Sequence, residues 1–149
     1  MDADGQHRPD ELETLVSPIV SGKADHVQGS RFLGEYDDAR SARHLGIVML
    51  TPIVNLLSGA EVTDCTTGYR AFRASSLAKL HLEEPQFPVA EIIAESARSG
   101  LAVQEVPVHI RSRSHGTSKK PRHLAYPLGY LGAVWRTVWR VRGSSLGSG

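Results

Sequence analysis

Apolar residues recur at helical spacing in four segments of the chain. The segments span residues 9–20, about 39–57, 89–99 and 123–142. Gly22, Gly59 and Gly100 follow the first three, at the position where helices commonly end. The second segment is apolar nearly all round from residue 45 to residue 57, which predicts a buried helix with a kink at Pro52. In the last segment one apolar stripe is formed by Leu124, Leu128, Leu131, Trp135 and Val138.

Shorter apolar runs between these helices predict three strands. They span residues 24–31, 69–73 and 102–110, and the first of them ends at a tight turn, Gly29-Ser30, followed by Arg31. A polar loop, residues 63–68, precedes the second strand. Helices that alternate with strands favour an α/β layer architecture with a largely parallel sheet.

Length and composition fit one globular domain. The 149 residues are 40% apolar and 22% charged, and the single cysteine, Cys65, excludes an intramolecular disulfide. The net charge of +1 conceals an asymmetry: residues 1–110 hold nine Lys/Arg and sixteen Asp/Glu, a net charge of −7, whereas residues 111–149 hold eight Lys/Arg and no acid, a net charge of +8. Such a basic segment favours an anionic partner, and the charge alone does not distinguish ligand phosphates, a membrane surface and nucleic acid. The sequence contains neither an apolar run of membrane-spanning length nor an apolar stretch of signal-peptide type.

The acidic start of the chain offers oxygen ligands at alternate positions. Asp2 and Asp4 can share one divalent cation, and Gln6 adds a third oxygen at the same spacing. An acidic loop that caps the helix after Pro9 explains the same residues. A calcium loop of EF-hand type is excluded because His7 stands where the sharp turn needs glycine.

Five short motifs occur in a specific order along residues 1 to about 125. They are Asp2-Ala3-Asp4-Gly5-Gln6-His7, Gly29-Ser30-Arg31-Phe32, Thr63-Asp64-Cys65-Thr66-Thr67-Gly68-Tyr69-Arg70-Ala71-Phe72, Glu105-Val106-Pro107-Val108 and His115-Gly116-Thr117-Ser118-Lys119. Together they resemble inverting glycosyltransferases of family 2, most closely the dolichol-phosphate mannosyltransferase or polyprenyl-phosphate glycosyltransferase branch.

The resemblance implies an α/β domain of the Rossmann-like GT-A type. Residues 1–122 would form the C-terminal part of the catalytic domain, residues 123–142 an amphipathic basic helix, and residues 143–149 a flexible tail. In the family the acidic motif follows a nucleotide-binding half, so we expect this chain to be an incomplete domain without that half.

The resemblance also assigns ligand-binding roles. Asp2, Asp4 and Gln6 would hold Mg²⁺ or Mn²⁺ against the donor diphosphate, and Arg31 and Arg43 would face the acceptor phosphate. Guanidinium groups suit phosphate oxygens. A surface salt bridge with residue 37 or 38 is the other explanation for Arg31.

Two acidic residues are candidates for catalysis. By the resemblance, Asp64 would orient or activate the acceptor, although it also suits a turn-forming position. Glu91 is the second candidate, and a first-turn glutamate favoured by the helix dipole explains it equally well. A lipid phosphate is already an anion, which weakens the case for a proton-abstracting base.

The basic loop after the third strand is assigned to the donor. By the resemblance, Arg111, Arg113, Ser118 and Lys119 would clamp the diphosphate, and a solvated basic loop is the alternative.

The last helix carries two Trp, two Tyr and three Arg residues, so it can lie in a membrane interface or pack on its own domain. The resemblance implies an enzyme on the cytoplasmic side, soluble or peripheral on the membrane. It would transfer a hexose from GDP-mannose or UDP-glucose to a polyprenyl or dolichyl phosphate. A saccharide acceptor and an inactive fragment are the alternatives. A nucleic-acid-binding module is disfavoured because no motif of that kind occurs.

Overall fold

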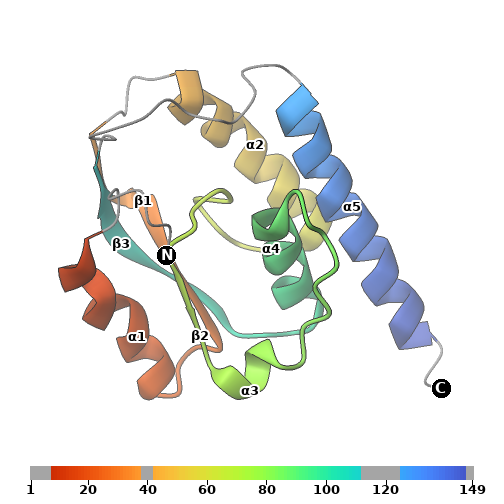
Figure 1. The fold of residues 1–149 in the computed structure, drawn as a ribbon, viewed down its shortest axis with the longest axis horizontal. Helices are drawn as coiled ribbons and strands as arrows, with labels where there is room; N and C mark the ends of the chain where they lie inside the picture. The colour runs from red at the N-terminus through yellow and green to blue at the C-terminus, as the bar shows by residue number, and fades with distance from the viewer. Residues whose placement is uncertain (1–7, 38–41, 112–124, 147–149) are drawn as a thin grey trace.

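The computed structural model describes residues 8–37, 42–111 and 125–146, and the described part is a layered α/β fold (Figure 1). The 3₁₀-helix η1 (Pro9–Glu11) leads into α1 (Leu12–Val20). The remaining elements are β1 (His26–Tyr36), α2 (Ala42–Ser58), β2 (Arg70–Phe72), α3 (Ala74–Leu77), α4 (Pro88–Arg98), β3 (Val103–Ile110) and α5 (Ala125–Leu146). The predicted α/β class is therefore confirmed.

The three described strands form a mixed sheet in the order β2-β1-β3. β3 runs parallel to β1, but β2 runs antiparallel to it, with Arg70 beside Gln28 and Phe72 beside His26. The pairing of β1 with β3 agrees with the predicted parallel sheet, whereas the short antiparallel pairing of β2 was not predicted. The chain enters β2 from the loop that contacts Arg31 of β1, so β2 can only run back along β1.

The two faces of the sheet differ because residues of β1 alternate between them. Val27 packs with Leu15 of α1 and with Val106 and Val108 of β3 in one apolar cluster. The other face carries buried polar residues: His26 contacts Ser96 of α4. Figure 1 shows α1 on one side of the sheet and α2, α4 and α5 grouped on the other.

β1 continues to Tyr36, so Gly29-Ser30 is not the predicted turn at a strand end. Gly29 is required for packing instead, because a Cβ at this position would lie 2.7 Å from both methyl carbons of Val108. The parallel register with β3 is regular up to Ser30, and it resumes only at Glu35 after an irregularity. Arg31 thus stands where β1 leaves its regular pairing.

The helix α2 is buried on one face only, contrary to the prediction that it is buried all round. Leu50 and Val54 belong to the second apolar cluster, whereas Leu45, Met49 and Leu56 are 61, 67 and 84% exposed. An apolar pattern shows that a helix avoids water, but it does not show what covers each face.

The helix α5 confirms the predicted last helix, which continues beyond Arg142 to Leu146 and so includes part of the predicted flexible tail. Its buried side is formed by Tyr130, Ala133, Val134 and Val138. Of the predicted stripe, Leu128 and Trp135 are exposed, and Trp139 is exposed beside them. Val138 of the predicted stripe lies in the apolar cluster and Leu131 packs against it, so the stripe was only partly misplaced. The error arose because the alanines and the tyrosine of the buried side were given less weight than leucine and tryptophan.

His26 should make the folded state sensitive to acid. Burial, and secondarily the charge of Arg70, lower the pKa of its imidazole to about 3. In the unfolded chain the imidazole binds a proton below about pH 6.5, whereas in the folded chain it stays neutral down to about pH 3. The free energy of unfolding therefore falls as the pH drops from about 6.5 towards 3, by up to about 1.4 kcal/mol per pH unit. We expect His26→Phe to remove this slope from the free energy of unfolding, measured by urea denaturation at several pH values.

The exposed His81 provides the matched control for that experiment, as His81→Gln. A slope that is unchanged in His26→Phe would contradict the assignment.

Candidate functional site

The centre of the candidate site is a buried ion pair between β1 and the loop of residues 63–68. Arg31 Nε lies 2.6 Å from Asp64 Oδ2, and the two side chains are 7 and 0% exposed. Arg31 Nη2 also donates to Thr66 Oγ1 at 3.2 Å. The two predicted site residues, one assigned to the acceptor phosphate and one to catalysis, are therefore in direct contact.

The Asp64 carboxylate is fully engaged by these neighbours. Its Oδ2 accepts from Arg31, and its Oδ1 accepts from the backbone N–H and the hydroxyl of Thr66 at 3.1 and 3.2 Å. A buried carboxylate whose oxygens already accept several hydrogen bonds is a poor general base, because no lone pair is left to take a proton from a substrate. The geometry favours a role in fixing the orientation of Arg31.

Two further residues of β1 hold the loop by hydrogen bonds. Ser30 Oγ lies 2.6 Å from Thr63 Oγ1, and Gln28 Nε2 donates to the Asp64 carbonyl at 3.0 Å. The serine and arginine of the Gly29-Ser30-Arg31 motif thus both contact the loop, one at each side of Asp64. This explains why the two motifs, which lie about thirty residues apart in the chain, occur together.

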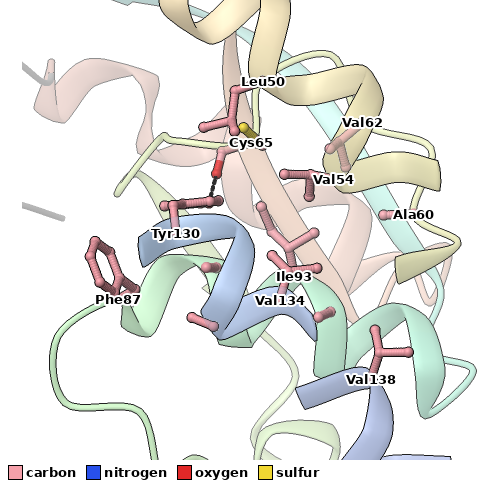
Figure 2. Close-up of a cluster of buried hydrophobic side chains, with 13 residues drawn as sticks. Leu50, Val54, Ala60, Val62, Cys65, Phe87, Ile93, Tyr130, Val134 and Val138 are labelled. Atoms are coloured by element: carbon pink, nitrogen blue, oxygen red, sulfur yellow. Dashed lines mark hydrogen bonds between the residues drawn. The ribbon is translucent and has the colours of Figure 1, made fainter. Parts of the chain in front are cut away.

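The helix α5 holds the same loop from the other side. Figure 2 shows the Tyr130 hydroxyl donating to the Cys65 carbonyl, with both residues in the apolar cluster between α2, α4 and α5. Burial raises the pKa of the Cys65 thiol to about 11, so the thiol stays protonated and packs as an apolar group. The sequence analysis counted Tyr130 among the aromatic residues suited to a membrane interface, but its ring is buried, and its contact with the loop has no signal in the local sequence.

Glu91 lies elsewhere and links three segments. It is 1% exposed and accepts from the backbone N–H groups of Glu83 and Glu84, both at 2.8 Å, and from Arg140 Nη2 of α5 at 2.8 Å. Burial opposes ionisation of Glu91, but these donors outweigh it and lower its pKa. The contacts give Glu91 a structural explanation, and the structure does not join it to Asp64.

Most of the residues assigned to the donor lie outside the described part of the chain. These are the predicted metal ligands Asp2, Asp4 and Gln6 and the loop residues Arg113, Ser118 and Lys119. Arg111 is exposed and follows directly after β3. Arg43 is the second residue of α2, but its side chain also lies outside the described residues. In the described ranges, no three His, Cys, Asp or Glu side chains gather to hold a metal ion.

An apolar stripe lies on the surface of α2. It consists of Leu45, Val48, Met49, Pro52, Ile53 and Leu56. The stripe contains no charged residue, and on α5 the exposed rings of Trp135 and Trp139 contact each other with a centroid distance of 5.8 Å. No helix in residues 8–37, 42–111 and 125–146 combines the length and apolar character needed to cross a bilayer.

Comparison with known proteins connects this arrangement to one family. The family model described as glycosyl transferase family 2 matches residues 1–80. A UDP-N-acetylglucosamine–dolichyl-phosphate N-acetylglucosaminyltransferase of Methanococcus voltae is 33% identical over 72% of this chain and 45% of its own length.

Two bacterial relatives show a similar match. An undecaprenyl-phosphate mannosyltransferase of Micrococcus luteus is 32% identical over 80% of this chain and 51% of its own length. A polyprenol monophosphomannose synthase of Mycolicibacterium smegmatis is 32% identical over 80% of this chain and 47% of its own length. The chain spans about half the length of these relatives.

Removal of Asp64 should be strongly destabilising. Asp64→Ala leaves the Arg31 guanidinium buried without its carboxylate, and breaking a buried pair in this way costs about 3–5 kcal/mol. We expect the free energy of unfolding from urea denaturation to fall by that amount. Asp10→Ala, which breaks the solvent-exposed pair with Arg8, is the control and should cause a much smaller loss. Equal losses in the two variants would contradict a stabilising role for the buried pair.

Proposed function

The chain belongs to glycosyl transferase family 2, and from this membership we propose that it supplies the acceptor site of an enzyme that transfers a hexose from a nucleotide sugar to a polyprenyl phosphate. One observation carries the proposal: the guanidinium of Arg31 is held in a single orientation by Asp64 and Thr66. A fixed, poorly hydrated guanidinium suits recognition of a phosphate monoester. The names of the relatives support an acceptor of this class.

In this mechanism the acceptor needs little chemical activation. A phosphate oxygen of the lipid attacks the anomeric carbon of the sugar, a new C–O bond forms, and the bond to the nucleoside diphosphate breaks with inversion. Because the attacking oxygen is already anionic, no proton has to be removed, which agrees with the occupied lone pairs of Asp64. Arg31 would orient the phosphate for attack, and Asp64 would keep Arg31 in place.

We assign the donor diphosphate to Arg111, Arg113, Ser118 and Lys119 and a divalent cation to the start of the chain. The three oxygen donors of Asp2, Asp4 and Gln6 fit Mg²⁺ or Mn²⁺, which favour oxygen ligands. Such an ion would neutralise charge that develops on the leaving diphosphate. We propose GDP-mannose or UDP-glucose as the donor.

We further propose that the apolar stripe of α2, together with Trp135 and Trp139 of α5, rests on a cytoplasmic membrane surface. Tryptophan favours the headgroup region, and an uncharged stripe loses no ion hydration when it enters the interface. The acid-free, basic residues 111–149 add attraction to anionic lipid. This placement would bring the lipid-borne phosphate to the protein.

Binding to lipid vesicles tests the acceptor site and the surface together. We expect the chain to bind vesicles of neutral and anionic phospholipid, and to bind more tightly when the vesicles contain undecaprenyl phosphate. Arg31→Lys retains the charge but loses the planar fork, so it should lower the phosphate-dependent increment by roughly tenfold or more. Arg73→Lys, at the residue directly after β2, whose side chain pairs with Asp25 instead, is the matched control. An increment that Arg31→Lys leaves unchanged would exclude Arg31 from acceptor binding.

In the same vesicle experiment, Leu56→Asn should weaken binding to vesicles that lack the lipid phosphate. Val20→Asn makes the comparable change at an 80% exposed residue of α1, on the opposite side of the sheet, and should have no effect. Equal binding by the two variants would show that α2 does not contact the membrane.

Donor binding is tested by thermal unfolding with UDP or GDP, each with and without Mn²⁺. A ligand of the folded state stabilises by about 2.7 kcal/mol at a concentration of 100 Kd, which raises the Tm by several degrees for a chain of this size. We expect a rise that requires Mn²⁺ and disappears in Asp4→Asn but persists in Asp10→Asn. A rise that is independent of Mn²⁺, or unchanged in Asp4→Asn, would overturn the metal assignment.

A further inference from the structure

Glu105 of β3 is joined to the site by an unusually complete set of hydrogen bonds. Its Oε2 accepts from the backbone N–H of Thr63 at 2.6 Å and from the Thr63 hydroxyl at 2.7 Å. Its Oε1 accepts from the backbone N–H of Asp64 at 3.1 Å and from Gln28 Nε2 at 2.9 Å. Both oxygens of one carboxylate are thereby committed to the loop and to the strand below it.

These bonds determine where the loop lies relative to the sheet. Gln28 and Glu105 are register partners in β1 and β3, so the two side chains stand next to each other on the same face. Gln28 Nε2 donates both to Glu105 and to the Asp64 carbonyl, and Glu105 in turn accepts from the Asp64 N–H. The backbone of Asp64 therefore has both its N–H and its carbonyl fixed by residues of the sheet.

We propose that Glu105 is a positioning residue that sets the place of Asp64, and through it the orientation of Arg31, for binding the acceptor phosphate. The inference rests on the proposed function, and it deepens that function by adding a residue of β3 to the acceptor site. The path is short: the carboxylate of Glu105 binds the Asp64 N–H, and the carboxylate of Asp64 binds Arg31 Nε at 2.6 Å.

The chemistry of the contacts requires a carboxylate at this position. All four groups that face Glu105 are donors: two backbone N–H groups, one hydroxyl and one amide NH₂. A glutamine would turn its own NH₂ towards at least one of them, so that two donors would oppose each other and a backbone N–H would lose its acceptor. The substitution would keep the shape of the side chain but remove an acceptor for a backbone N–H of the loop.

The test compares Glu105→Gln with Glu61→Gln, which makes the same change at an exposed glutamate two residues before the loop. The first readout is the Nε–Hε signal of Arg31 in a ¹⁵N correlation spectrum, assigned by its loss in Arg31→Lys. The second is the increment in vesicle affinity due to undecaprenyl phosphate. We expect Glu105→Gln to shift or broaden the Arg31 signal and to lower the increment about tenfold, with vesicle binding otherwise unchanged. Glu61→Gln should resemble the wild type.

The outcomes distinguish a failure of the positioning role from a failure of the proposed acceptor binding. An Arg31 signal and a phosphate-dependent increment that both stay at wild-type values in Glu105→Gln would overturn the positioning role and leave the acceptor site standing. If the wild-type chain shows no phosphate-dependent increment, the proposed function fails, and the Arg31 signal alone decides whether Glu105 positions it. If Glu105→Gln does not fold, Thr63→Val decides: it removes one donor to Glu105, and an unchanged Arg31 signal would overturn the inference.

Discussion

Arg31 and Asp64 bury two opposite charges side by side, and the arrangement of the residues around them follows from the free energy that desolvation of these charges costs. Each charge is tolerable in the interior only because the other lies beside it and because further donors complete the carboxylate. The loop that carries Asp64 must therefore be held firmly, since a small displacement would leave a buried charge uncompensated. This requirement explains why one short loop is bound from the sheet and from α5 at once.

The alternation of β1 supplies both the stability and the site. Val27 faces the apolar cluster under α1, whereas its neighbours Gln28 and Ser30 face the polar side and contact the loop. The strand then departs from regular pairing after Ser30, at Arg31, whose side chain pairs with Asp64. A regular strand would have continued the alternation, so the irregularity allows Arg31 to reach the loop while β1 still pairs with β3 further along.

The side of the fold that carries α2 and α5 has a different character. Its interior is a conventional apolar cluster, but its surface retains an uncharged stripe and a pair of tryptophan rings. The Tyr130 bond to the Cys65 carbonyl ties this side to the loop of Asp64 (Figure 2). A helix proposed to contact lipid is thus in direct contact with the loop that would hold the lipid phosphate site in place.

The sequence alone determined most of the local structure, because helix periodicity and terminal glycines depend on neighbours in the chain. The ends of α1 and α4 at Gly22 and Gly100, both with positive φ, follow from that local chemistry. The family was also recognisable, since its motifs are short runs whose order survives without a structure. What the periodicity could not determine was which face of α2 or α5 is covered, because that depends on the neighbours the helix meets.

The site itself was decided by the tertiary structure. Arg31 and Asp64 were identified separately, and nothing in their spacing showed that each satisfies the charge of the other. Gly29 was mistaken for a turn residue because the methyl groups of Val108 that exclude a side chain there lie about eighty residues away in the chain. Glu105 was visible only as part of a motif, since its partners come from β1 and from the loop. The local sequence does not show contacts between segments that lie far apart in the chain, and it is such contacts that bring β1, the loop and β3 together in the candidate site.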